Sequence, residues 1–146
     1  MATQRTGRTE LKELGEFGLI DRLTENIKLK NKSTVKGVGD DAAVIDAGDK
    51  YMIVTNDLLV EGVHFDMTYT PLKHLGYKAA VVNISDVVAM NGEAKQIIVS
   101  FAVSNRFSVE ALEEIYEGLL LACERYGVDL VGGDTSASLT GMMISV

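Results

Sequence analysis

Aspartates stand at the boundaries of apolar segments along this chain, and they are the side chains best suited to carry chemistry. Asp57 follows the predicted strand 51–56, Asp86 interrupts the apolar stretch 79–90, and Asp134 follows a pair of glycines. Burying an unpaired carboxylate costs on the order of several kcal/mol, and neighbouring carboxylates repel one another. The basic side chains between Gly37 and Arg106 are few: Lys50, Lys73, Lys78 and Lys95. Ion pairs within the chain can therefore balance only part of this acidic set, and bound cations are expected to balance the rest.

The candidate ligands are all hard oxygen donors, and the chain has no cluster of cysteine and histidine. This chemistry favours Mg²⁺ over zinc or copper. Asp40 and Asp41 follow a Gly-Val-Gly segment, while Asn83 and Asp86 are three residues apart and so lie on one face of a helix. The alternative interpretation is that these acids are scattered caps and turn residues, a common role for aspartate.

Other motifs carry less weight. The segment 37–42, GVGDDA, fits the loose dinucleotide pattern, but no strand precedes it and two carboxylates would repel a pyrophosphate. The chain has no P-loop motif. His64 and Tyr116 are candidate site residues whose simpler roles are a satisfied histidine and a core aromatic.

The helices and strands that must position these residues are predicted from the spacing of apolar residues and from the residues that begin and end such elements. Apolar spacing predicts a helix over 10–27, a second over 70–90 that Thr70 caps, with Pro71 at its first position, and a third from Ser108 to Gly127. Short strands are predicted at 42–45, 51–56, 94–104, 129–131 and 139–146, with 58–66 as loop or strand. The segments 28–36 and 132–138 are predicted to be loops, and residues 1–8 a frayed end.

This order predicts an α/β domain of the α+β type, with a mixed or antiparallel sheet that carries its helices on one face. The 146 residues are 47% hydrophobic and 24% charged, which suits one folded domain and excludes a disordered chain. A net charge of −7 gives no field that attracts nucleic acid or anionic lipid. One cysteine, no signal-peptide pattern and no apolar run long enough to span a bilayer predict a cytoplasmic protein. The apolar segment 142–146 suggests that the chain is cut within a strand.

Four segments together resemble the N-terminal domain of the thiamine-monophosphate kinase family. They are GVGDDAAVI at 37–45, VTNDLLVEGVHF at 54–65, GYKAAVVNISDVVAMNG at 76–92 and VGGDTSAS at 131–138. The opening segment 13–23 is also similar to the start of that family. The resemblance places the fold in the aminoimidazole ribonucleotide synthetase-like superfamily, whose members use ATP. It implies direct transfer of phosphate from ATP to thiamine monophosphate, with Mg²⁺ ions held between them.

The resemblance assigns roles residue by residue. It implies metal ligands at Asp41, Thr55, Asn56, Asp57, Asp86 and Asp134. It makes Asp57 and Asp86 the catalytic pair, His64 a substrate contact, and Tyr116, Gly133 and Asp134 nucleotide contacts. A phosphate monoester is mostly ionised at neutral pH, so such a transfer needs cations and alignment more than a general base or a covalent intermediate.

The resemblance also implies that residues 1–146 form an N-terminal domain for ATP and Mg²⁺ binding and for dimerisation through the sheet, with 9–146 as its ordered core. The strand 94–104 is the candidate pairing element. The family's C-terminal domain is absent, so the isolated chain is expected to be inactive. Two alternatives stay open: another ATP-using synthetase of the superfamily, or a dimerisation module without catalysis.

Overall fold

The computed structural model describes residues 9–146, and the predicted frayed end at 1–8 lies outside them. Three strands form a small antiparallel sheet in the order β1-β2-β3: β1 (Thr34–Lys36), β2 (Ala43–Asp46) and β3 (Tyr51–Val54). Four strands form the main sheet in the order β4-β7-β5-β6: β4 (Leu58–Val60), β5 (Gln96–Val103), β6 (Asp129–Ala137) and β7 (Met143–Ser145). The main sheet is mixed, because β5 and β6 are parallel and the other pairs are antiparallel.

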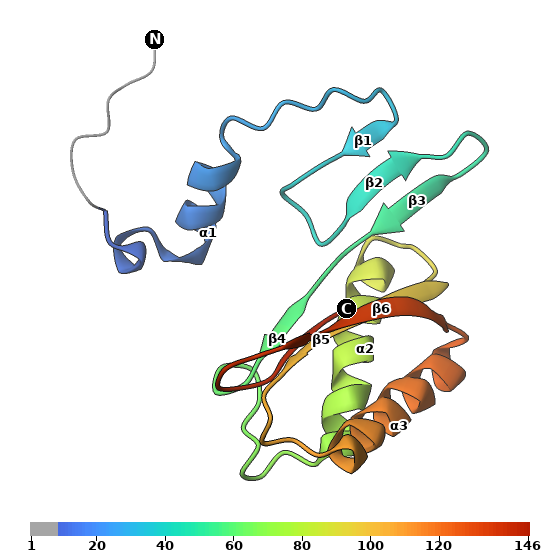
Figure 1. The fold of residues 1–146 in the computed structure, drawn as a ribbon. Helices are drawn as coiled ribbons and strands as arrows, with labels where there is room; N and C mark the ends of the chain where they lie inside the picture. Colours follow the sequence, from blue (N-terminus) through green and yellow to red (C-terminus); the bar gives the residue numbers. More distant parts are fainter. Residues whose placement is uncertain (1–8) are drawn as a thin grey trace.

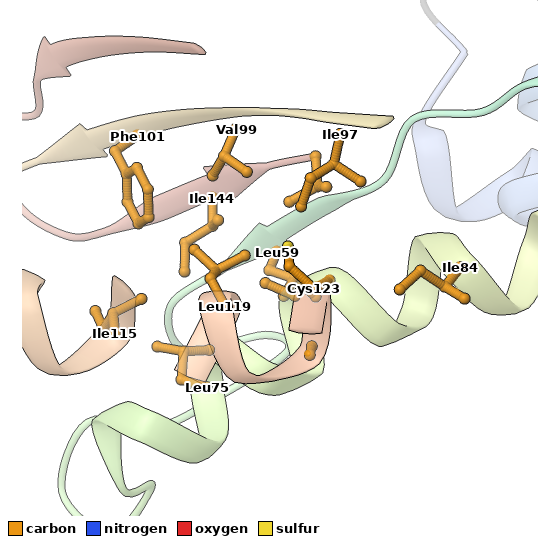
Figure 2. Close-up of a cluster of buried hydrophobic side chains, with 14 of the residues drawn as sticks. Leu59, Leu75, Ile84, Ile97, Val99, Phe101, Ile115, Leu119, Cys123 and Ile144 are labelled. Atoms are coloured by element: carbon orange, nitrogen blue, oxygen red, sulfur yellow. The ribbon is translucent and has the colours of Figure 1, made fainter. Parts of the chain in front are cut away.

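Two helices, α2 (Leu72–Ala89) and α3 (Val109–Tyr126), lie together against one face of the main sheet (Figure 1). This arrangement confirms the predicted fold class. Strand β5 shows why only one face is covered: Ile97, Val99 and Phe101 are buried, while the intervening Ile98 is 60% exposed. Side chains alternate between the two faces of a strand, so β5 gives its apolar set to the helices. Figure 2 shows Ile97, Val99 and Phe101 facing Ile115 and Leu119 of α3.

The two helices approach closely because each has a glycine at the crossing. A Cβ on Gly76 of α2 would lie 1.8 Å from the carbonyl oxygen of Ile115, and one on Gly118 of α3 would lie 1.9 Å from that of Lys73. The crossing thus leaves no room for a larger residue. Leu75, Ile115 and Leu119 fill the space around it and are fully buried.

Helix α3 begins and ends as predicted. The Ser108 hydroxyl accepts a hydrogen bond from the Ala111 amide at 3.3 Å, and Gly127 takes the left-handed conformation with φ 66°. The predicted cap of α2 is wrong, because the helix begins at Leu72 after Pro71 and has no side-chain cap. The Thr70 hydroxyl instead accepts from the amide of Asp66 at 3.3 Å, in the turn before the helix.

Helix α1 (Leu11–Thr24) forms within the predicted range, with a break at Gly15, where φ is 64°. None of its residues is buried, and Phe17 on its predicted apolar face is 81% exposed. In Figure 1 this helix stands apart from both sheets. Its apolar spacing therefore identified a helix correctly but did not identify a core contact.

Two predicted loops contain strands. The basic segment 28–36 includes β1, whose residues pair with β2. The glycine-rich segment 132–138 continues β6, which pairs with β5 along its whole length from Asp129 to Ala137. Neither segment has strong strand propensity by itself, so hydrogen bonding to the neighbouring strand stabilises the extended conformation. Within residues 9–146, no helix has both the length and the apolar character that a membrane span requires.

Candidate functional site

Two of the predicted carboxylates, Asp41 and Asp57, lie near enough to a third, Asp86, to act on it electrostatically. Burial raises the pKa of Asp86 above its usual 3.8, and the negative charges of Asp57 and Asp41 raise it further. The Thr55 hydroxyl opposes this shift, because it donates a hydrogen bond to Asp86 Oδ2 at 3.3 Å. We call Asp41, Thr55, Asp57 and Asp86 the carboxylate cluster.

The four members of the carboxylate cluster come from three parts of the chain. Asp41 precedes β2, Thr55 and Asp57 lie in the link between β3 and β4, and Asp86 lies in the last turns of α2. The Thr55 hydroxyl also contacts the backbone carbonyl of Asp41 at 2.9 Å, so it joins two of these segments. The predicted convergence of distant acids is therefore present for these residues.

Asn83 is a positioning residue that the sequence analysis did not include among the site residues. It is 5% exposed, and its side-chain oxygen accepts from the backbone amide of Asp57 at 3.0 Å. Its amide nitrogen donates to the Ala79 carbonyl at 3.1 Å. Asn83 thus fixes the backbone of Asp57 against the helix that carries Asp86. The spacing of Asn83 and Asp86 was the available signal for this role.

The cluster has no protein cation among the described residues. The ion pairs within 9–146 are Lys36–Asp40, Lys73–Glu117, Lys95–Glu93 and Arg106–Glu61, and none involves Asp41, Asp57 or Asp86. Within the same residues, no group of three or more His, Cys, Asp or Glu side chains is arranged to hold a metal ion by itself. Mg²⁺ commonly takes one or two carboxylates and completes its octahedron with water and substrate phosphates. The oxygen donors of the cluster fit such a shared ion.

Substituting Asp86 should stabilise the metal-free fold. A raised pKa means that the folded protein binds the proton more tightly than the unfolded chain does. The contribution of Asp86 to the free energy of unfolding is therefore largest below 3.8 and falls as the pH rises through the folded-state pKa. We expect Asp86→Asn, measured in a chelator, to have a higher Tm than the wild type at pH 7. The difference should vanish near about pH 3, where both side chains are neutral.

The matched control is Asp49→Asn, because Asp49 is an exposed aspartate in the turn between β2 and β3. Its Tm should follow that of the wild type at both pH values. A lower Tm for Asp86→Asn at pH 7 would contradict the electrostatic interpretation of the cluster.

Asn56 has a different environment from its neighbours. Its amide nitrogen donates to the Ser145 hydroxyl and to the Val146 carbonyl, both at 2.9 Å. Its side-chain oxygen accepts from the Ser145 hydroxyl at 3.3 Å. The structure therefore does not bring the Asn56 side chain to the carboxylates, and Asn56 instead joins the start of β4 to the end of β7.

The three predicted nucleotide contacts, Tyr116, Gly133 and Asp134, do lie together. They line an open cleft of about 560 Å³ beside β6, with Val99, Leu130 and Thr135 among the other lining residues. The Tyr116 ring stacks on Phe101 with centroids 5.4 Å apart. A bulge shapes the floor of the cleft: Ile97 pairs with Leu130 and Ile98 with Gly132, so Val131 is an extra residue.

Asp134 does not join the carboxylate cluster in this chain. It lies in β6, at one edge of the main sheet, while Asp57 precedes β4, at the other edge. Adjacent strands are about 4.8 Å apart, so three steps separate the two edges by roughly 14 Å. The single site that the sequence suggested is therefore divided into the carboxylate cluster and the cleft.

His64 lies in a third place, in the turn that follows β4. The turn and Asp57 are at opposite ends of β4, and the His64 side chain is exposed. The imidazole Nδ1 accepts a hydrogen bond from the Val60 amide at 3.0 Å.

Comparison with known proteins identifies the family. The family model described as AIR synthase related protein, N-terminal domain, matches residues 39–146, which is more than half of the chain. The chain belongs to this family. Both the carboxylate cluster and the cleft lie within the matched AIR synthase related region, whereas α1 and β1 precede it.

Two relatives of this chain are thiamine-monophosphate kinases. The thiamine-monophosphate kinase of Aquifex aeolicus is 41% identical over 128 residues, which cover 88% of this chain and 40% of that protein. The thiamine-monophosphate kinase of Bacillus subtilis is 37% identical over 134 residues, which cover 91% of this chain and 41% of that protein. This AIR synthase related chain therefore spans about two fifths of the length of these relatives.

Solved structures agree with the fold. A structure described as AaThiL complexed with AMPPCP and TMP matches with a TM-score of 0.83 and 38% identity, over 96% of this chain and 43% of that one. A HypE–HypF complex matches with a TM-score of 0.62 at 19% identity, over 87% of this chain and 39% of that one. The second likeness shows a shared AIR synthase related fold only.

Proposed function

We propose that this chain is the N-terminal, nucleotide- and magnesium-binding part of a kinase that transfers a phosphate group from ATP to thiamine monophosphate, giving thiamine diphosphate. The observation that carries the proposal is the carboxylate cluster. Its three carboxylates, Asp41, Asp57 and Asp86, concentrate negative charge, and none forms an ion pair with a basic side chain among the described residues. The named relatives support the substrate, because they are thiamine-monophosphate kinases with 33–41% identity to most of this chain.

In this proposal Asp41, Asp57 and Asp86 would hold magnesium ions that each take one or two of these carboxylates, with Thr55 as a further oxygen donor. When bound, magnesium screens the charge between two phosphate groups that would otherwise repel each other. Thr55 and Asn83 keep the carboxylates oriented, through the hydrogen bonds to Asp86 Oδ2 and to the Asp57 amide. The Asp57 amide also donates to the Val146 carbonyl at 3.0 Å, so its backbone is held from two sides.

The cleft beside β6 is the proposed nucleotide site. Tyr116 offers a ring face, and Gly133 keeps β6 close to β5 along the cleft, because a Cβ there would lie 1.8 Å from the Val99 carbonyl oxygen. Asp134 pairs with Ser100 across the parallel strands, which fixes its place at the mouth of the cleft. We propose Asp134 as a ligand of a magnesium ion that accompanies the nucleotide, separate from the carboxylate cluster.

His64 is the proposed contact to the phosphate acceptor. The chemistry needs no general base, since the second pKa of a phosphate monoester is near 6 and the attacking oxygen is mostly ionised at neutral pH. The residues of this chain therefore bind and orient the two substrates, and none is required to become covalently modified.

We further propose that two copies associate in the cytoplasm through the uncovered face of the main sheet. The predicted pairing element at 94–104 is central in that sheet, between β7 and β6, so it has no unpaired backbone edge to offer. Its outward Ile98 is 60% exposed, and this apolar side chain is available for face-to-face packing.

The decisive experiment is an acceptor assay with the full-length protein, ATP and Mg²⁺. We expect thiamine diphosphate to form from thiamine monophosphate, with one ADP released for each product molecule. Formylglycinamidine ribonucleotide and selenide serve as matched alternatives, because they test for a synthetase of the same superfamily. ATP consumption with either of these, and none with thiamine monophosphate, would reject the proposed substrate.

A further inference from the structure

The turn after β4 fixes three separate groups of His64. The Val60 amide donates to the imidazole Nδ1 at 3.0 Å, and the His64 amide donates to the Val60 carbonyl at 2.9 Å. Lys78 reaches across from α2, and its Nζ donates to the His64 carbonyl at 2.8 Å. The ring, the amide and the carbonyl of one exposed histidine are thus all held in place.

The turn itself is secured without Lys78. The carboxylate of Glu61 accepts from the Met142 amide at 2.9 Å and pairs with Arg106. Gly62 supplies the positive φ of 79° that the turn requires, and the Phe65 side chain is buried. Removing the Lys78 amine should therefore release the His64 carbonyl while the turn remains folded.

The Nδ1 contact determines which hydrogen bond the ring can offer. Because Nδ1 accepts a hydrogen bond from the Val60 amide, it carries no hydrogen of its own. The neutral imidazole must therefore hold its hydrogen on Nε2. Among the described residues Nε2 has no partner. An exposed N–H donor fits an acceptor-only group such as a phosphate oxygen, and it cannot remove a proton from a substrate.

We propose that Lys78 is a positioning residue that holds the backbone of His64 in the orientation from which its Nε2–H donates to a phosphate oxygen of the acceptor substrate. The inference rests on the proposed function for the identity of the acceptor. It adds Lys78, a residue of α2 outside both the carboxylate cluster and the cleft, to the residues that determine acceptor binding.

Kinetics on the full-length protein test the positioning role. Lys78→Met should raise the KM for thiamine monophosphate by about tenfold or more, since small misplacements of a binding group are costly. The KM for ATP should stay unchanged, and Lys78→Arg should restore much of the acceptor affinity. Lys73→Met is the matched control, because Lys73 lies on the same helix in an exposed ion pair with Glu117. An acceptor KM within about twofold of the wild type, or equal rises in both KM values, would overturn the proposal.

Histidine NMR tests the inference without relying on activity. In ¹⁵N–¹H correlation spectra at about pH 8, where an ordinary histidine is neutral, His64 should show the Nε2–H form alone. Lys78→Met should keep the Nε2–H form, because the Val60 amide still donates to Nδ1, but it should shift the His64 ring resonances, because the carbonyl that Lys78 holds is released. A proton on Nδ1 in the wild type, or His64 ring resonances in Lys78→Met identical to those of the wild type, would overturn the positioning role. A failed acceptor assay with these NMR results in place would reject only the proposed substrate.

Discussion

Asp86→Asn and Asp57→Asn should each lower kcat for phosphate transfer by about a thousandfold or more, which corresponds to several kcal/mol of transition-state stabilisation. The amide keeps the shape of the carboxylate and can still accept the hydrogen bond that Thr55 donates to residue 86. It removes the negative charge that would hold magnesium between the reacting phosphates. The measurement is steady-state formation of thiamine diphosphate by the full-length protein at saturating ATP and Mg²⁺.

Asp49→Asn again provides the matched control, since it makes the same chemical change on an exposed turn. Its kcat should equal that of the wild type. Activity of Asp86→Asn within about tenfold of the wild type would show that the carboxylate cluster does not serve the reaction. Because the same variant should be more heat-resistant in a chelator, loss of activity cannot be attributed to unfolding.

Gly133→Ala should destabilise the protein by about 3 kcal/mol, at the upper end of the usual cost of overpacking. A Cβ on Gly133 would lie 1.8 Å from the carbonyl oxygen of Val99, a backbone atom of the neighbouring strand that cannot turn aside. The strands β5 and β6 would have to separate at the floor of the cleft. Urea unfolding of the variant and the wild type measures the difference in the free energy of unfolding.

Gly132→Ala makes the same substitution one residue earlier, where an added Cβ would meet nothing within 4 Å. Glycine weakens a strand interior, so this variant should be as stable as the wild type or slightly more stable. Equal destabilisation by both substitutions would mean that the bulge, and with it the cleft, is not built as described.

The parts of the fold that depend on neighbouring residues could be predicted from the sequence. Ser108 and Gly127 bound α3 as expected, because capping by a hydroxyl and termination by a left-handed glycine are local events. Thr70 does not cap α2, because its hydroxyl accepts a hydrogen bond from the Asp66 amide in the preceding turn and not from an amide of the helix.

The parts that depend on distant pairing could not be predicted. The residues 132–137 are small and polar, so their composition suggests a loop, yet β5 supplies a complete row of backbone partners. The same order of strands places Asp134 and Asp57 at opposite edges of the main sheet. The proximity of Asp41, Thr55 and Asp57 could be expected, because they lie on either side of one hairpin; only Asp86 comes from a distant element, α2. Their role as metal ligands stays a prediction.

The raised pKa of Asp86 means that its negative charge is unfavourable in the folded protein, and this has a consequence for protein engineering. A variant library screened only for survival on heating would be enriched in neutral residues at this position, because the charge opposes folding in the absence of metal. Such a screen would return a more stable domain that lacks the charge which the proposed function assigns to magnesium binding. Positions 41, 57 and 86 should therefore be held constant when this domain is stabilised.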